Sequence, residues 1–284
     1  MNLPLITKEQ LKEWHACSKG YRWFLDKFPQ GGAYTDVHAA LTADGLCADA
    51  RWLTDRMYDT YLDNPEFIRT ETDMTDRMIR ELTRPEHTSG QAEGENNSDD
   101  NAQIGSSGYN ARIGSSGYNA RIGSSGSYAR IGSSGYNAQI GSSGYNAQIG
   151  SSGYNARIGS SGDDAQIGSS GDDAQIGSSG KYAQIGSSGD DAQIGSSGNY
   201  AQIGSSGSYP RITATGNGSV VACASDIECI VLGEGGCASV PWHDGKRIRI
   251  AVAYVGENGI EANTPYYVNN KGQFTRLTET TEEQ

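Results

Sequence analysis

The central part of the chain repeats one nine-residue unit without an insertion. Starting at Ala102, the unit reads Ala, then Gln or Arg, then Ile-Gly-Ser-Ser-Gly, and ends on two variable residues. Every ninth residue from Ile104 to Ile212 is isoleucine. A fixed period of this kind is typical of repeat architectures, in which each unit packs against its neighbours along one axis. The repeat therefore argues against a single globular core for the whole chain.

The pattern within one unit predicts a short strand followed by a turn. Ala and Ile lie two residues apart, so they face the same side of a strand. Gly-Ser-Ser-Gly predicts a turn, and we expect its glycines to occupy positions with positive φ. One unit cannot bury its Ala/Ile face alone, but parallel stacking buries it continuously. The sequence thus predicts a parallel β-solenoid over residues 102–218. Its core residues are expected to be Ile104, Ile113, Ile122, Ile131, Ile140, Ile149, Ile158, Ile167, Ile176, Ile185, Ile194 and Ile203.

Two features of this solenoid stay open at the level of sequence. Either two units or three units close one coil, which gives a flattened or a triangular cross-section, and the handedness is not readable from the pattern. The alternative to a solenoid is a flexible linker, because Gly/Ser-rich tracts usually behave as random coils. The apolar pair at constant phase argues against the linker, which needs no fixed apolar position.

The segments on either side of the repeat differ from it in pattern. Residues 1–86 show helical spacing of apolar residues and predict a small helical domain, with a capping box at Thr7 and Gln10. Residues 87–101 are polar and acidic, and predict a linker or an irregular cap at the start of the solenoid. Residues 219–284 contain strand and hairpin patterns and predict a β domain that caps the solenoid. The predicted fold class is α+β, with several domains.

The two variable residues of each unit carry the candidate binding chemistry. They are mostly Tyr-Asn in the first half of the array and often Asp-Asp in the second half, and arginine occupies the outward strand position mainly in the early units. Tyr and Arg are favoured at protein interfaces, so these residues predict a binding stripe. The alternative is a face that only keeps the protein soluble and whose sequence diverges as repeats are duplicated. The predicted binding residues are Arg112, Arg121, Arg130, Arg157, Tyr109, Tyr118, Tyr136, Tyr145 and Tyr154.

Charge and cysteine content limit the classes of partner and the cellular location that we expect for the protein. The formal net charge of −12 argues against a nucleic-acid partner, which usually requires a basic surface, and against an anionic membrane surface. No run of 18 apolar residues is present, and the N-terminus lacks the apolar core of an export signal. The five cysteines are odd in number and loosely spaced, so we expect reduced thiols and a cytoplasmic location.

No motif for catalysis, a metal or a cofactor stands out. Cys223, Cys229, Cys237 and His243 lack the short Cys-x-x-Cys pair that structural zinc sites favour. The Asp pairs occur in too few units for a calcium-binding roll, and Gly-Ser-Ser-Gly lacks the Lys-Ser/Thr end of a phosphate loop. We therefore expect no metal, no cofactor and no enzymatic activity.

The array resembles a family of repeat proteins encoded by bacteriophages and prophages. That family carries Ala-x-Ile-Gly-Ser-Ser-Gly arrays closed by an aromatic strand, and the segment from Tyr267 to Phe274 is similar to its closing motif, although one residue shorter. The stretches 11–17 and 23–32 resemble helical modules of prophage proteins. The resemblance implies a solenoid fold and no established activity or catalytic residue.

These observations lead to three functional hypotheses. The first is a non-enzymatic phage-type accessory protein, a rigid scaffold that binds a bacterial host protein, with inhibition or anti-defence as one form of that role. The alternative is a structural protein that forms homo-oligomers through the solenoid or the helical domain. Binding to ice or another solid surface ranks third, because the exposed positions do not form a uniform Thr ladder.

Overall fold

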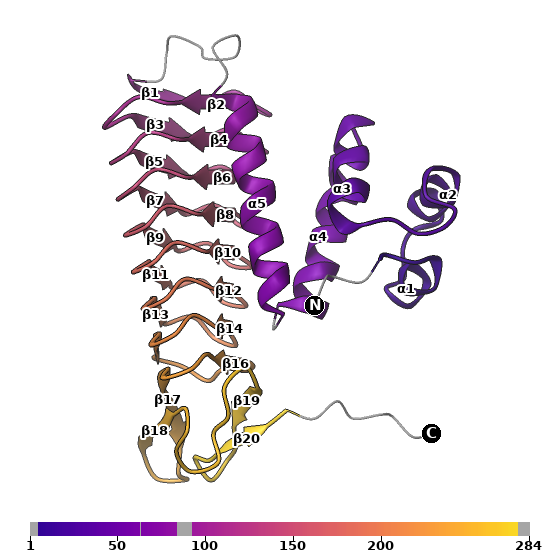
Figure 1. The fold of residues 1–284 in the computed structure, drawn as a ribbon. Coiled ribbons are helices and arrows are strands. Elements are labelled where there is room, and N and C mark those ends of the chain that lie inside the picture. The colour runs from indigo at the N-terminus through magenta and orange to yellow at the C-terminus, as the bar shows by residue number, and fades with distance from the viewer. Residues whose placement is uncertain (1–4, 63, 84–92, 278–284) are drawn as a thin grey trace. The chain divides into compact units, whose positions relative to one another are not determined.

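The computed structural model describes residues 5–62, 64–83 and 93–277, and it confirms the predicted fold class (Figure 1). Five helices precede a parallel β-solenoid, which ends in antiparallel strands. The chain forms two compact units, residues 1–70 and residues 71–284. The last helix crosses this boundary, so its residues 71–82 group with the solenoid.

The first unit is built from helices around a small aromatic and aliphatic core. Phe24, Leu53 and Phe67 are each at most 2% exposed. The predicted capping box is confirmed: the Thr7 hydroxyl accepts from the Gln10 backbone N–H, and the Gln10 side chain accepts from the Thr7 N–H. The helices are α1 (Lys8–Glu13), α2 (Ser18–Lys27), α3 (Tyr34–Ala43), α4 (Cys47–Tyr61) and α5 (Pro65–Leu82).

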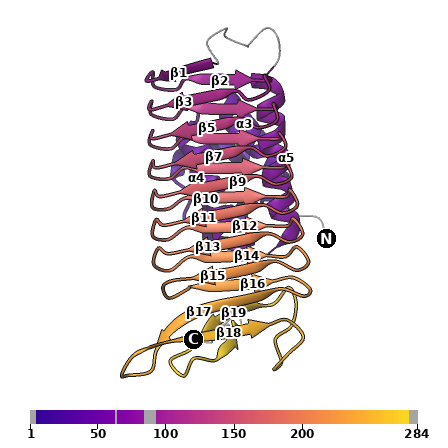
Figure 2. The same ribbon diagram turned by 90° about the vertical axis from the view of Figure 1, so that its left-hand side faces the viewer.

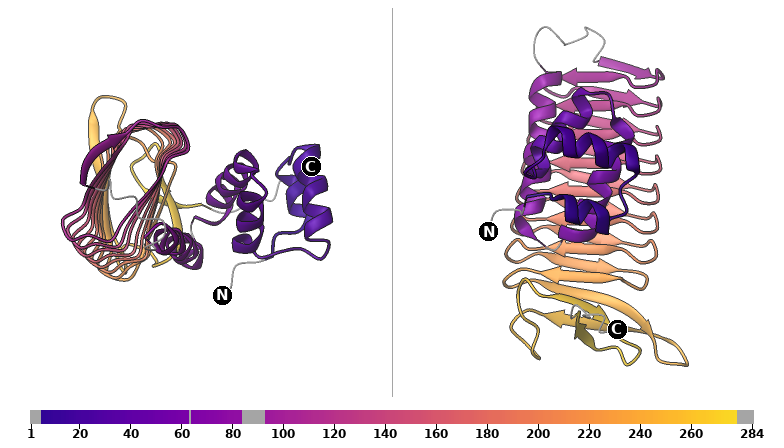
Figure 3. Two further views of the ribbon diagram at one scale, coloured as in Figure 1. Left: turned by 90° about the horizontal axis from the view of Figure 1, so that it is seen from above. Right: turned by 90° about the vertical axis from the view of Figure 1, so that its right-hand side faces the viewer.

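The solenoid consists of two ten-stranded sheets that face each other (Figures 2 and 3). Successive strands alternate between the sheets, so one coil holds two units and partners along a sheet lie 18 residues apart, as Gln103 and Arg121 do. Of the two coil shapes left open by the sequence, the flattened coil is therefore the one formed.

We call the two sheets the odd sheet and the even sheet after the numbers of their strands up to β17; the last three strands, β18 to β20, do not follow this alternation. The odd sheet holds β1 (Glu93–Asn97), β3 (Arg112–Ser115), β5 (Arg130–Ser133), β7 (Gln148–Ser151), β9 (Gln166–Ser169), β11 (Gln184–Ser187), β13 (Gln202–Ser205), β15 (Val220–Cys223), β17 (Cys237–His243) and β18 (Ile248–Tyr254). The even sheet holds β2 (Gln103–Ser106), β4 (Arg121–Ser124), β6 (Gln139–Ser142), β8 (Arg157–Ser160), β10 (Gln175–Ser178), β12 (Gln193–Ser196), β14 (Arg211–Ala214), β16 (Cys229–Leu232), β19 (Pro265–Val268) and β20 (Phe274–Arg276).

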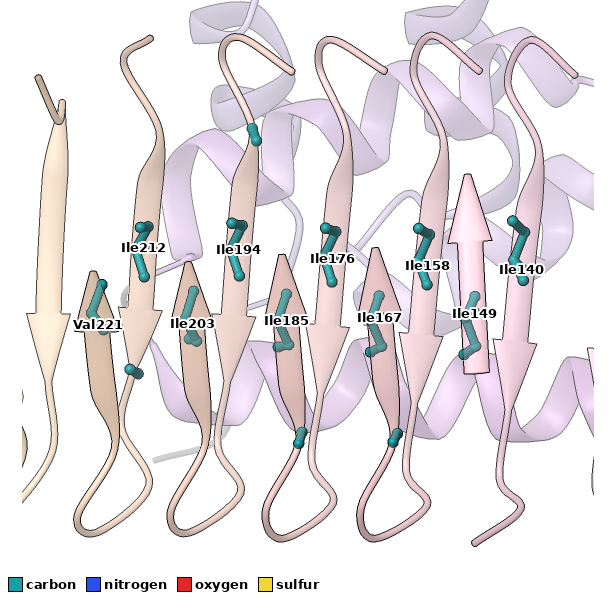
Figure 4. Packing of buried hydrophobic residues seen from close by; sticks show 14 of the residues in the cluster. Ile140, Ile149, Ile158, Ile167, Ile176, Ile185, Ile194, Ile203, Ile212 and Val221 are labelled. Carbon is teal, nitrogen blue, oxygen red and sulfur yellow. The ribbon is translucent and has the colours of Figure 1, made fainter. Parts of the chain in front are cut away.

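Isoleucines stack in register through the interior of the solenoid (Figure 4). Along the odd sheet Ile167 pairs with Ile185, and along the even sheet Ile176 pairs with Ile194. The repeat isoleucines from Ile104 to Ile203 are at most 8% exposed. The first serine of each unit also points inward, and from Ser106 to Ser205 it is at most 7% exposed. Each unit therefore contributes Ala, Ile and Ser to the core.

The expectation that the repeat glycines take positive φ is wrong. The second variable residue of each unit takes that conformation instead, as Asn110 (60°), Tyr128 (58°) and Asp164 (57°) show. Asn and Asp tolerate the left-handed region better than other non-glycine residues, which explains their frequency at this position. The last glycine of a unit serves close packing: a Cβ added at Gly144 would collide with the carbonyl oxygen of Gly126 on the preceding coil.

Both ends of the solenoid carry strands outside the strict repeat. At the C-terminal end β17 and β18 pair antiparallel on the odd sheet, while β19 and β20 form the predicted hairpin on the even sheet. At the N-terminal end β1 pairs parallel with β3 through an irregular register. The described part of the acidic segment, residues 93–101, thus begins the odd sheet, and residues 87–92 lie outside the described residues.

The last glycine of a unit and the first glycine of a unit on the odd sheet predict opposite responses to substitution by alanine. We expect Gly144→Ala to lower the free energy of unfolding by about 1–3 kcal/mol, because its Cβ meets fixed backbone. Gly168→Ala is the matched control, since a Cβ there meets no atom within 4 Å and alanine costs less entropy than glycine. Thermal unfolding followed by circular dichroism measures both. Equal melting temperatures for the two variants would contradict the packing described.

Candidate binding surface

The outer face of the odd sheet carries a shallow groove along the solenoid. From β3 to β13, the outward residues of each odd strand are an Arg or Gln and, two residues later, a Gly, so successive coils align a column of long polar side chains beside a column of glycines. The groove has a volume of about 1420 Å³ and extends from Arg112 on β3 to Ala222 on β15. We call its glycine column the odd channel.

On the even sheet, residues 71–82 of α5 lie over the corresponding glycine column from Gly105 to Gly159 (Figure 1). A Cβ added at Gly123 would lie 3.2 Å from the Cα of Ile79, and one at Gly105 would collide with the backbone of Leu82. At Gly141 the added Cβ would lie 2.5 Å from Thr75 Cγ2. The absence of side chains at these positions is therefore what allows the helix to approach the sheet.

Polar contacts between described residues also hold α5 in this position. Arg157 on β8 forms an ion pair with Glu71, with Nη2 and Oε2 2.7 Å apart and the two side chains only 16% and 6% exposed. The Ser161 hydroxyl donates to Asp76 Oδ1 over 2.7 Å. Burial raises the pKa of the Asp76 carboxyl, and the bond from Ser161 partly opposes that rise. The structure thus places Arg157, a predicted binding residue, in an internal contact.

The odd channel has no such occupant among the described residues. A Cβ added at Gly132, Gly150, Gly168 or Gly186 would meet no described atom within 4 Å. Beside the channel, Arg112 and Arg130 are register neighbours on β3 and β5, and both are exposed. Glu93 on β1 is the other register neighbour of Arg112. The ion pairs between described side chains include neither arginine. The predicted Arg121 is half-buried on the even sheet, so the structure separates the four predicted arginines.

The predicted tyrosines lie on two opposite edges of the solenoid. The turns after odd strands carry Tyr118, Tyr136 and Tyr154, whose rings stack at centroid distances of 5.3 and 5.1 Å. The turns after even strands carry Tyr109 and Tyr145, with Tyr128 between them at 5.2 and 5.8 Å in edge-to-face contacts. Sequence reasoning left Tyr128 out of the predicted binding residues, because it occupies the second variable position of its unit, 19 residues after Tyr109, rather than the first.

The aspartates of the variable pairs bind the backbone of the next coil. Asp163 accepts from the Lys181 N–H over 2.8 Å, and Asp172 accepts from the Asp190 N–H over 3.0 Å. Asp173 also hydrogen-bonds the Tyr154 hydroxyl, which raises the pKa of Tyr154 to about 12. These contacts give the Asp-rich half of the array a structural role within the turns.

The structure brings together no group of three or more His, Cys, Asp or Glu side chains suited to a metal within the described residues. Of the four residues weighed as a zinc set, Cys223 and Cys229 are buried, Cys237 is half-buried and His243 is exposed. Burial raises the pKa of the Cys223 thiol to about 12, so it stays protonated at neutral pH. In the described ranges, no helix combines the length and apolar character that crossing a bilayer requires.

The ion pair between Arg157 and Glu71 predicts a local effect of mutation. Because Arg157→Ala leaves the buried Glu71 carboxylate without its partner, we expect a cost of about 3–5 kcal/mol, the range for breaking buried pairs. Arg112→Ala, at the equivalent position of the odd sheet, is the matched control and costs little. Hydrogen–deuterium exchange of residues 71–82 measures the effect directly, because loss of the contact should speed the exchange of these amides. Unchanged protection in Arg157→Ala would show that the pair does not hold α5.

Comparison with known proteins identifies similarity for the helical unit. Residues 1–62, which contain α1 to α4, match the protein family described as the YdhT N-terminal domain. The uncharacterized protein YdhT of Escherichia coli (strain K12) is 38% identical over 101 residues, which is 36% of this chain and 36% of that protein. The matched region thus spans about a third of that relative. No solved structure gives a significant match. The comparisons therefore relate residues 1–62 to the YdhT N-terminal domain.

Proposed function

We propose that this is a non-enzymatic accessory protein of phage type that binds a bacterial host protein through the open face of its solenoid. The observation that carries the proposal is the odd channel with its neighbouring arginines, a regular surface that no described part of the chain covers. An inhibitory or anti-defence effect follows if the bound host surface is one that the host protein needs. A cytoplasmic partner is consistent with the cysteines that form no disulfide among the described residues, such as Cys17 and Cys223.

The physical basis for such a role is preorganisation. Every outward side chain of the odd sheet is fixed to a strand that pairs with both neighbours along the sheet, from β3 to β15. A surface that is already ordered loses little conformational entropy when a partner binds, so more of the contact energy appears as affinity. The stacked tyrosines on both edges add large, partly exposed ring surfaces next to this face.

The proposal predicts that host-protein capture depends on the odd channel. The full chain serves as bait in a bacterial lysate, next to Gly168→Leu, which places a side chain in the open channel, and Lys181→Leu, which adds the same side chain on an exposed turn. We expect at least one host protein to be retained by the wild type and by Lys181→Leu, and to be lost with Gly168→Leu. Absence of any partner with this dependence, as seen by mass spectrometry, would count against the proposal.

A second candidate function is self-assembly, which the exposed strand β18 favours. This strand ends the odd sheet and pairs with β17 on one side only. Its outward side chains are apolar and exposed: Ile248 by 70%, Ile250 by 58% and Val252 by 52%. Exposed apolar edge strands are sites of pairing between chains. An antiparallel pair of two copies centred on Ala251 would set Ile250 opposite Val252, so the strand is complementary to itself.

Self-assembly through β18 predicts a dimer that a charge at this edge disrupts. In sedimentation velocity at micromolar concentration, we expect the wild type to form dimers and Ile250→Lys to be monomeric. Val220→Lys introduces the same charge on the same outer face, at a 46% exposed position of β15 inside the sheet, and should leave the dimer intact. A wild type that stays strictly monomeric removes this candidate.

A further inference from the structure

We propose that the odd channel binds an acidic amphipathic helix of the partner protein, in the way that the even sheet holds α5. This inference rests on the proposed function and names the kind of partner surface that the open face accepts. Its basis is the comparison of the two sheets, which are built from the same repeating unit but differ in what covers them.

The contacts of α5 show how a helix fits a glycine column. Leu82 lies against Gly105, Ile79 against Gly123 and Gly141, and Thr75 against Gly141 and Gly159. The contact residues are three or four positions apart, which corresponds to a rise of about 4.5–6 Å along a helix. Neighbouring strands of a sheet lie about 4.8 Å apart. One side chain of the helix therefore meets about one coil of the solenoid.

The odd sheet has the same kind of glycine column, but no described helix lies over it. Gly132, Gly150, Gly168 and Gly186 follow one another along the sheet at the same strand position as the glycines under α5. Because the two sheets have the same strand sequence, a helix with small or apolar residues at every third or fourth position meets the same backbone geometry there.

Charge determines which helix fits. On the even sheet the Glu71 carboxylate neutralises Arg157. On the odd sheet Arg112 and Arg130 are register neighbours at the N-terminal end of the channel, and Glu93 on β1 is the other register neighbour of Arg112, so Arg130 is the arginine with no acidic register neighbour. A helix that runs in the direction of α5, with its C-terminal end toward the earlier coils, places the negative end of its macrodipole over these arginines. Acidic side chains in the last turns of the helix then complete the pairing.

The test uses a helical peptide with the sequence of residues 65–82 of this chain and the substitution Arg80→Glu, which makes the last turn acidic at a position that is exposed in α5. A lactam between Asp73 and a lysine introduced by Arg77→Lys keeps the isolated peptide helical, since both positions are exposed in α5 and unconstrained helices of this length are marginal in water. The even sheet of the full chain already holds its own α5, so the odd channel is the available site. Binding is measured by fluorescence anisotropy with the labelled peptide and the full-length protein.

We expect saturable binding that Gly168→Leu weakens at least tenfold and Lys181→Leu leaves unchanged. Arg130→Glu should also weaken binding at least tenfold, and a peptide carrying Ile79→Glu should not bind. Failure to saturate up to millimolar protein, or equal binding by Gly168→Leu, overturns the inference.

Failure of this inference is distinguishable from failure of the proposed function. A host protein lost with Gly168→Leu while the helical peptide does not bind means that the face binds a protein by another kind of contact. Peptide binding without any such host protein supports the odd channel as a helix-binding site and overturns the proposed host-binding role.

Discussion

The in-register stacking of identical units is the constraint on which the whole solenoid depends. A coil of two units buries two isoleucines, two alanines and two serines between the sheets, so its core is thin and no coil is stable alone. Stability comes from repetition, because each coil adds backbone bonds such as Gln139 N–H to Ala120 C=O and extends the isoleucine column. A single coil out of register would expose its isoleucines and break the ladder on both sides.

Glycine has two separate roles in this repeat, and together they relate the fold to its surface. The last glycine of each unit lets successive turns stack at backbone contact, as Gly144 does on Gly126. The first glycine leaves a column free of side chains on each outer face. On the even sheet, residues 71–82 of α5 pack against that column, which attaches this helical segment to the solenoid. On the odd sheet the same column is open, and it provides the surface proposed to bind a partner.

How far the sequence predicts the structure depends on whether the signal is local. The Ala-x-Ile period predicts strands and an interior isoleucine column, and the Thr7–Gln10 box predicts a helix start, because both involve neighbours along the chain. The number of units per coil is not determined by a nine-residue pattern, since it depends on the angle of each turn. For the same reason the tyrosines were expected in one stripe, whereas alternate turns place Tyr118 and Tyr128 on opposite edges. The contact of Arg157 with Glu71 joins residues 86 positions apart, and neither residue is unusual in its local sequence.

Amide hydrogen exchange across the repeat tests the central claim of a rigid two-sheet solenoid most directly. The structure predicts slow exchange at amides that bond the neighbouring coil, such as those of Gln139, Ser143 and Gln148, with the same nine-residue pattern of protection from one unit to the next. Uniformly fast exchange over residues 103–214 would contradict the account, because it would mean that the array is a mobile chain without an ordered face.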